Sequence, residues 1–272
     1  MIISIPGIVS QGGIILPPKG GALNDYSWKE ISLISNAGVA DEYFAVGDRK
    51  AVTLNGTVGS LSFSDETYYC YIIGINHNSA VEGDNRIHFQ FGYSDLKDGT
   101  HLAFVDSGLY SGEKTSGTWF NMNNSSSNNG GWNSSRMRTV ICPAFQNVMP
   151  LELGSVLKTV TKYSDNTGGG TNNAAYVTAT TDTIFLLSQY EVYGSITTAN
   201  RAEKNHQAQY AFYSYGNSVI KYGHSSTHPE IYWFLRSVDV SWASYFCAVS
   251  PSGRMSSSNA TFSTGFAPAF CV

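Results

Sequence analysis

The chain has 272 residues, of which 42% are hydrophobic and only 13% are charged, and its formal net charge is −4. This composition supplies enough apolar surface for a hydrophobic core and excludes an intrinsically disordered chain. A net negative charge provides no basic field for a phosphate backbone, so nucleic-acid binding is not expected.

The first 26 residues favour an extended arm. Their aliphatic residues are interrupted by Pro6, Gly7, Pro17 and Pro18, which break helices and central strands. We expect this arm to pack on another copy of the chain or on a virion component, and a strand laid on its own domain is the alternative. No basic segment precedes an apolar one, and no run reaches about 18 apolar residues, so neither a signal peptide nor membrane insertion is expected.

The remaining residues, 27–272, are predicted to form one α+β domain. Ser27 and Glu30 are spaced as a capping box, and apolar residues at helical spacing follow until Gly38, which predicts a helix. Runs of β-branched and aromatic residues predict strands at 51–56, 68–75, 87–91, 182–188, 232–235 and 266–270. The pair Asn55-Gly56 predicts a hairpin turn.

A long polar segment, residues 111–135, separates the two halves of the predicted domain. It is rich in Asn, Ser and Gly, and Ser134 or Ser135 is expected to cap a second helix that continues through Phe145. Loops of this length are usually functional or packed onto the body. The pattern as a whole predicts a twisted, mostly antiparallel sheet with two main helices and extensive loops.

The cysteines and histidines do not show a metal-binding or catalytic spacing. Each of the four cysteines, Cys70, Cys142, Cys247 and Cys271, has apolar neighbours, which indicates buried free thiols. His224 and His228 are four residues apart only in a loop bordered by Gly and Pro. Asp239 and nearby oxygens could ligate calcium, but no EF-hand spacing exists. We therefore expect no metal and no cofactor.

Residues 238–264 mix small hydroxyl and amide side chains with aromatic ones, between the apolar runs at 232–235 and 266–270. Binding surfaces use this mixture, because Tyr and Trp give a large contact area at low entropic cost while Ser and Asn adapt their hydrogen bonds. Pro251, Ser252 and Gly253 predict a turn between two short strands. The alternative is an ordinary serine-rich hairpin that binds nothing.

The predicted ligand-binding residues are Asp239, Ser241, Trp242, Ala243, Ser244, Tyr245, Ser250, Ser252, Ser257, Ser258 and Asn259. We expect them on one exposed face, with four apolar residues buried beneath it: Trp233, Leu235, Phe266 and Phe270. Surface positions tolerate substitution at little cost in stability, whereas core positions do not. Trp132 is a further core candidate, and Arg136, Arg138 and Arg236 are expected to pair with acidic or backbone groups.

Seven short motifs in fixed order resemble a family of uncharacterised domains of phages, prophages and gut Firmicutes. They are Trp28-x-Glu30-Ile31, Tyr43-Phe44-x-Val46-Gly47-Asp48, Ile72-Ile73-Gly74-x-x-His77, Gly130-Gly131-Trp132-x-x-Ser135-x-Met137-Arg138, Leu186-Leu187-Ser188-x-x-Glu191-Val192, Trp233-x-Leu235-Arg236-Ser237 and Gly265-x-x-Pro268-Ala269-Phe270. The last two are also similar to the C-type lectin-like fold of phage tail receptor-binding proteins, whose C-terminal stretch can be diversified by retroelements.

This resemblance implies a receptor-binding protein of a phage or prophage that displays a variable C-terminal surface to a host cell-surface protein or glycan. Its expected location is the virion or, before assembly, the bacterial cytoplasm. Formylglycine-generating enzymes share the broad fold, but Cys247 and Cys271 lack the basic setting of a reactive thiol, and no catalytic motif is present. We expect no enzyme; a lectin-fold enzyme and a purely structural virion protein are the alternatives.

Overall fold

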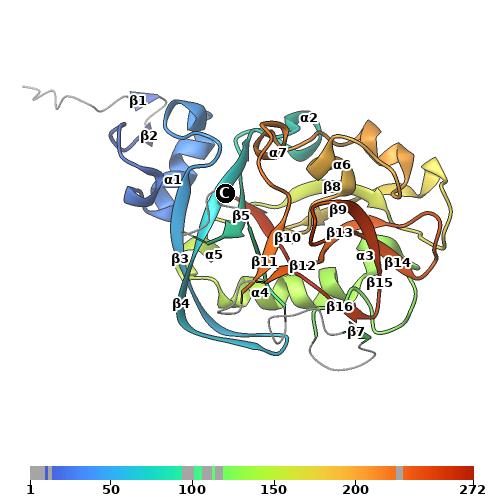
Figure 1. Cartoon of the computed structure of the whole chain (residues 1–272). Helices are drawn as coiled ribbons and strands as arrows, with labels where there is room; N and C mark the ends of the chain where they lie inside the picture. Colours follow the sequence, from blue (N-terminus) through green and yellow to red (C-terminus); the bar gives the residue numbers. More distant parts are fainter. Residues whose placement is uncertain (1–9, 12–13, 94–100, 106–111, 114–118, 225–228) are drawn as a thin grey trace, which may run out of the picture.

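The computed structural model describes residues 10–11, 14–93, 101–105, 112–113, 119–224 and 229–272 (Figure 1). In this part of the chain the strands pair antiparallel, apart from the parallel pairing of β6 with β11. The predicted α+β class with mostly antiparallel sheets is therefore confirmed. The buried apolar residues form one cluster that extends from Leu23 to Val272.

The largest sheet has five strands. Their order is β10 (Ile184–Phe185), β17 (Ala269–Cys271), β5 (Ile87–Gly92), β4 (Leu61–Ile75) and β3 (Arg49–Val58). The predicted turn at Asn55-Gly56 is wrong, because β3 continues to Val58 and its register shifts between Leu54 and Gly56. Gly56 has a φ of 119°, so it forms an irregularity within the strand instead of ending it.

The described residues also form four smaller sheets and a short N-terminal hairpin. A three-stranded sheet is made of β13 (Trp233–Val238), β14 (Tyr245–Val249) and β15 (Met255–Asn259). Figure 1 shows it on the opposite flank of the molecule from the long β3–β4 hairpin. The remaining strands are β8 (Val160–Asp165) with β9 (Val177–Asp182), β12 (Glu230–Ile231) with β11 (Lys221–Gly223) and β6 (Leu102–Ala103), β16 (Phe262–Ser263) with β7 (Gly112–Glu113), and β1 (Ser10–Gln11) with β2 (Ile14–Ile15).

The helices are short. In the described residues they are α1 (Trp28–Asn36), α2 (Ser79–Glu82), α3 (Gly131–Ser134), the π-helix η4 (Met137–Ile141), α4 (Cys142–Val148), α5 (Leu151–Gly154), α6 (Gln189–Tyr193) and α7 (Ala211–Ser214), with 3₁₀ turns at η1 (Leu23–Asp25), η2 (Ala40–Glu42), η5 (Ala174–Tyr176) and η6 (Arg201–Asn205). The predicted capping box of α1 is confirmed. Ser135 caps the second helical run, because its Oγ accepts a hydrogen bond from the Arg138 N–H at 3.1 Å.

The two longest helical segments, α1 and the η4–α4 run, pack on one face of the five-stranded sheet. Phe89 and Phe91 of β5 point to this face. Phe89 meets Trp28 of α1, with ring centroids 5.4 Å apart, and Phe91 meets Phe145 of α4 at 5.2 Å. The alternation predicted for residues 87–91 therefore places aromatic side chains against helices.

The other face of β5 is polar and is buried as well. His88 Nδ1 lies 3.0 Å from the Tyr210 hydroxyl, and Gln90 Oε1 accepts hydrogen bonds from Tyr213 and Lys221. All five side chains are buried. A buried polar face needs internal partners, and these partners include a network of ionised groups described below.

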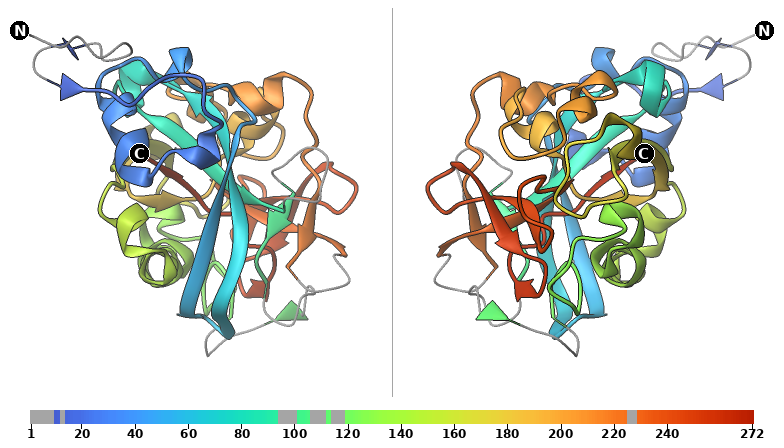
Figure 2. Two further views of the ribbon diagram at one scale, coloured as in Figure 1. Left: turned by 90° about the vertical axis from the view of Figure 1, so that its left-hand side faces the viewer. Right: turned by 90° about the vertical axis from the view of Figure 1, so that its right-hand side faces the viewer.

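Part of the predicted arm is attached to the body of the molecule. Leu16 is buried, and the carbonyls of Pro17 and Pro18 accept hydrogen bonds from Tyr43 and Tyr26. From Leu16 onward the segment therefore packs on its own domain, which is the alternative that the sequence left open for the arm. The β1–β2 hairpin lies at the edge of the molecule, far from β13–β15 (Figure 2). Ile15 is 64% exposed, whereas the aliphatic residues at positions 1–9 lie outside the described residues.

Two loops of the second half are interlocked. A Cβ added to Gly131 would lie 1.9 Å from the carbonyl oxygen of Asp165, and one added to Gly168 would lie 2.1 Å from the carbonyl oxygen of Asn128. Both glycines have positive φ. The segment 121–131 is thus a loop whose backbone is packed against residues 165–170, which agrees with the expectation that it packs onto the body.

We predict that Gly131→Ala lowers the free energy of unfolding by at least about 2 kcal/mol, because the new Cβ clashes with backbone and the φ of 52° is strained for alanine. Gly154→Ala is the matched control, since nothing lies within 4 Å of its Cβ position in α5. Urea denaturation measures both. Equal stabilities of the two variants would contradict the interlocked arrangement.

Candidate functional site

The predicted ligand-binding residues lie on the loop after β13 and on the β14–β15 hairpin, and they differ in exposure. Trp242 is 63% exposed. Ser241, Ala243 and Ser252 are also exposed, while the half-buried ones are Ser244, Tyr245, Ser257 and Asn259. The residues expected beneath them, Trp233, Leu235, Phe266 and Phe270, are fully buried as predicted.

Three of the predicted residues are buried, and the expectation that they are exposed is wrong. The Asp239 carboxylate accepts hydrogen bonds from the Ser241 N–H at 2.7 Å and from the Ser257 hydroxyl, so it braces the loop from inside. Ser250 Oγ accepts from the Arg254 N–H within the turn. Ser258, opposite Phe246, points to the inner side of the hairpin, as strand alternation requires.

The remaining residues, apart from Ser252, define what we call the hairpin surface: Ser241, Trp242, Ala243, Ser244, Tyr245, Ser257 and Asn259. Ser252 belongs to the turn at the opposite end of the hairpin, because Tyr245 pairs with Asn259 and Val249 with Met255. The rings of Trp242 and Tyr245 are tilted against each other, with centroids 6.2 Å apart. A hollow of about 240 Å³ lies beside them, lined by Tyr232, Tyr245, Ser257, Ser258, Asn259 and Phe262.

A buried amide, Asn128, holds the loop of the hairpin surface in place. Its Nδ2 group donates to the carbonyls of Asp239 at 3.2 Å, Trp242 at 3.0 Å and Tyr245 at 2.8 Å. Its Oδ1 accepts from the Gly169 N–H at 2.8 Å, and its own N–H donates to the carbonyl of Ala243 at 2.7 Å. One side chain therefore joins three segments through their backbone atoms. The sequence provided no signal for it, since Asn128 stands in a row of similar Asn and Ser residues.

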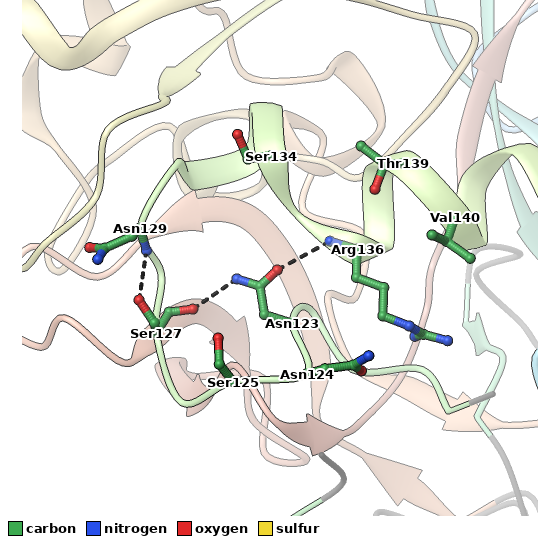
Figure 3. A pocket seen from close by; sticks show the side chains of 9 residues that line it. All are labelled: Asn123, Asn124, Ser125, Ser127, Asn129, Ser134, Arg136, Thr139 and Val140. Carbon is green, nitrogen blue, oxygen red and sulfur yellow. Dashed lines mark hydrogen bonds between the residues drawn. The ribbon is translucent and has the colours of Figure 1, made fainter. Parts of the chain in front are cut away.

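A second hollow, of about 730 Å³, lies between the 121–129 segment and the helices that follow it (Figure 3). We call it the loop hollow; it is lined by Asn123, Asn124, Ser125, Ser127, Asn129, Ser134, Arg136, Thr139 and Val140. Asn123 fixes its wall, because its Nδ2 donates to the Ser127 carbonyl and its Oδ1 accepts from the Arg136 N–H. The Asn259 amide donates to Ser126 at 2.8 Å, so the same loop also contacts the hairpin surface.

The core of the molecule contains an ionic network. Arg236 of β13, which is fully buried, pairs with Glu191 of α6 through both carboxylate oxygens. Lys162 of β8 donates to Glu191 at 3.0 Å, to Glu82 at 2.6 Å and to the Tyr210 hydroxyl at 2.9 Å. The expectation that Arg236 is structural is confirmed. Arg138 likewise pairs with Asp182 at 2.5 Å, and Arg136 donates to the Trp119 carbonyl.

Burial and charge act differently on the acidic members of this region. Burial disfavours the charged form of Glu191, but Arg236 and Lys162 outweigh it and hold the pKa of Glu191 well below its usual range. For Glu82, burial is the larger effect and raises the pKa. Burial also raises the pKa of Glu203 to about 7, although Ser237 and the Asp165 N–H donate to its carboxylate.

His77, Glu82 and Glu191 are the described residues whose side chains lie close enough to hold a metal ion. Their ligand atoms are within 4.8 Å of one another, and His77 Nε2 is buried without a hydrogen-bond partner. The Lys162 ammonium, however, already bridges the two carboxylates. A divalent ion beside it and Arg236 would leave uncompensated positive charge in a buried site, so this cluster does not suit a metal.

Of the other metal ligands considered from the sequence, the described histidine and Asp239 already have hydrogen-bond partners within the chain. His224 Nδ1 accepts from the Val105 N–H at 3.2 Å, and His228 lies outside the described residues. The Asp239 oxygens are used by Ser241 and Ser257. All four cysteines are buried free thiols, as predicted. Burial raises the pKa of both Cys247 and Cys271, which opposes formation of the nucleophilic thiolate.

The fold and this site define an α+β protein whose polar and aromatic surface is held on a buried ionic scaffold. Residues 113–272, more than half of the chain, match the family described as a domain of unknown function (DUF6273), and the chain belongs to this family. The matched region contains the hairpin surface, the loop hollow, Lys162, Glu191 and Arg236. Neither a curated protein nor a solved structure matches the chain.

Across the residues that the structure describes, none of the helices combines the length and the apolar character that crossing a membrane requires.

We predict that Asn128→Asp costs about 3 kcal/mol of stability, because the carboxylate cannot donate and would face three carbonyl oxygens in a buried site. Asn129→Asp, the same change at the adjacent exposed residue, should stay within about 0.5 kcal/mol of wild type. Chemical denaturation compares the two. If Asn128→Asp is as stable as Asn129→Asp, the Asn128 contacts do not hold the loop.

The raised pKa of Glu203 predicts a pH-dependent effect of Glu203→Gln. Between its ordinary value of 4.5 and about 7, the unfolded chain releases this proton while the folded protein keeps it. Wild type therefore loses stability through this group as pH rises, and Glu203→Gln should gain relative to wild type by on the order of 3 kcal/mol from pH 4.5 to pH 7.

Unfolding free energies of both proteins across this pH range provide the measurement. Glu152→Gln is the control, because Glu152 is exposed, and its difference from wild type should be flat. The difference in unfolding free energy between Glu203→Gln and wild type should therefore grow as pH rises. If it is independent of pH, or shrinks as pH rises, Glu203 is not buried and protonated as described.

Proposed function

We propose that the protein is a ligand-binding protein of a phage or prophage that uses the hairpin surface to bind a protein or glycan on the host cell. The observation that carries this proposal is Trp242, an indole that is 63% exposed on a loop held by internal hydrogen bonds. Large exposed aromatic residues on rigid loops are typical of binding hot spots. The Tyr245 ring lies beside the indole, and Tyr245, Ser257 and Asn259 line the adjacent hollow with polar groups.

The way the loop is held supports a surface whose side chains can vary. Asn128 donates hydrogen bonds to the backbone carbonyls of four residues: Asp239, Trp242, Ala243 and Tyr245. A substitution at Ser241, Trp242, Ala243 or Ser244 would leave these contacts unchanged. The loop therefore has a fixed backbone and unconstrained side chains. This arrangement favours a C-type lectin-like variable protein, which the sequence resembles, and we propose the C-type lectin-like fold for this chain.

The enzymatic alternative is less consistent with the positions of the thiols. Cys247 and Cys271 have no exposed surface, and Cys271 Sγ lies 3.2 Å from His88 Nδ1 in the core. A nucleophile that a substrate cannot reach does not support catalysis. We therefore propose a binding function, in the virion or in the bacterial cytoplasm before assembly, and the purely structural virion role is an outcome of the test below.

We predict that Trp242→Ala weakens binding to host cells by about tenfold or more, because aromatic hot spots contribute about 2 kcal/mol or more. The melting temperature should stay nearly unchanged, since the indole is outside the core. Labelled full-length protein, tested on a panel of bacterial strains and on a glycan array, provides the measurement.

Tyr215→Ala is the matched control, because Tyr215 is 72% exposed and directly follows α7, which lies apart from β14 and β15 (Figure 1). It should bind like wild type. If Trp242→Ala and Tyr245→Ala both bind like wild type, or if wild type binds no cell and no glycan, the hairpin surface is not a binding site and a structural role takes its place.

A further inference from the structure

We propose that the outer edge of β15 binds an extended segment of a host cell-surface protein, which adds to the sheet as a further strand. This binding mode rests on the function proposed above and selects a protein over a glycan as the ligand. In the part of the chain that the structure describes, β15 pairs with β14 along one edge and with no strand along the other. A sheet edge of this kind is the template for β-strand addition.

The pairing with β14 determines which backbone groups of β15 point outward. Antiparallel pairs alternate between residues that exchange hydrogen bonds and residues that do not. The Ser250 N–H donates to the Arg254 carbonyl, so every second residue from Arg254 onward is bonded to β14. The N–H and C=O groups of the intervening residues therefore point away from β14: Met255, Ser257 and Asn259. Among the described residues, none forms a hydrogen bond with these outward groups.

The hollow of about 240 Å³ beside Tyr245, which we call the edge hollow, reaches this edge. It is lined by three consecutive residues of β15, Ser257, Ser258 and Asn259. Because successive side chains of a strand point to opposite faces, a hollow that contacts all three extends over the edge of the strand. An added strand therefore passes directly over the edge hollow.

The walls and the volume of the edge hollow suit one large side chain of the added strand. The walls outside β15 are aromatic: Tyr232, Tyr245 and Phe262. The volume of about 240 Å³ lies below the range of roughly 300–1,000 Å³ that small-molecule sites occupy. An aromatic or large aliphatic residue of the partner fits such a space, because it gains the contact area that anchors interfaces.

Arg254 adds a charge at the other end of the edge. It directly precedes β15 and is exposed, and its guanidinium has no ion-pair partner among the described residues. Arg254 and Ser258 are four residues apart, so they lie on the same face of the strand, about 13 Å from each other. A partner segment that meets both features carries an acidic residue and a large apolar residue four positions apart.

These features fit a strand of a different protein better than a glycan or a second copy of this chain. A saccharide has no row of N–H and C=O groups at the spacing of a strand, so it cannot continue the hydrogen-bond ladder. Pairing of β15 with the same strand of a second copy would give Arg254 no acidic partner, since residues 254–264 contain neither Asp nor Glu.

The test compares variants of the full-length protein on cells of a strain that wild type binds. Ser257→Pro removes the outward N–H and leaves the pairing with β14 intact, because proline is tolerated where the N–H of an edge strand faces away from the sheet. Ser257→Ala is its reference, since both variants lose the hydroxyl that donates to Asp239. Ser257→Pro should bind about tenfold or more weakly than Ser257→Ala. Circular dichroism checks the fold of both variants.

Arg254→Glu tests the charge, and it decides the matter if Ser257→Pro does not fold. It should bind cells about tenfold more weakly than wild type, and Arg254→Lys should recover most of this loss. Lys29→Glu is the control for charge reversal, because Lys29 is exposed on α1, on the opposite flank from β15 (Figure 1). It should bind like wild type.

Treatment of the cells and a peptide library identify the class of the partner. Proteinase digestion of the cells should abolish binding, whereas periodate oxidation of their glycans should not. Full-length protein should also select, from a displayed library of random linear peptides, sequences with an acidic residue four positions from a large apolar one. These peptides should bind Arg254→Glu and Ser257→Pro about tenfold or more weakly than wild type.

Trp242→Ala separates failure of this binding mode from failure of the proposed function. If only Trp242→Ala loses cell binding, the hairpin surface is a binding site and the β15 edge is not used, which overturns the proposal. Binding that survives proteinase but not periodate also overturns it. If wild type binds no cell, the proposed function fails; the edge is then supported by selected peptides that depend on Arg254 and overturned if the library gives none.

Discussion

The buried ion pair between Arg236 and Glu191 is the interaction on which the rest of the structure depends. Arg236 lies on β13, the strand that leads directly into the loop of the hairpin surface, and it also donates to Ser164 of β8 at 2.9 Å. Removing one partner of such a pair leaves an uncompensated charge in the core, which costs about 3–5 kcal/mol. The network therefore fixes β13 against α6 and β8, and the exposed loop begins from a rigid strand.

Asn128 connects the surface loop to the segments packed beneath it. It joins the 121–131 loop, the 165–170 loop and the residues after β13 through backbone atoms. The hairpin surface and the loop hollow thus share one support, and the side chains of Ser241, Trp242, Ala243 and Ser244 do not contribute to the Asn128 contacts. A protein that must recognise changing ligands gains from this arrangement, because surface substitutions then cost little stability.

Several regular elements could be predicted from the sequence because local signals determine them, whereas the strand predicted at 182–188 is limited to β10 at Ile184–Phe185. The capping box at Ser27 and Glu30 and the turn at Ser252 and Gly253 require only nearby residues. The ionic network could not be predicted, because Glu82, Lys162, Glu191 and Arg236 are far apart in the chain and meet only in the fold. The burial of Asp239 was missed for a similar reason, since its carboxylate turns inward to Ser257.

The most direct test of the account is hydrogen–deuterium exchange of the full-length protein, alone and bound to isolated envelopes of a bacterial strain that it recognises. The account predicts that binding slows exchange in residues 121–131, 239–245 and 255–259, while β4, β5 and β8 exchange as slowly as they do without the ligand. Protection confined to other surfaces, such as the β3–β4 hairpin, would contradict the claim that this end of the molecule binds the ligand.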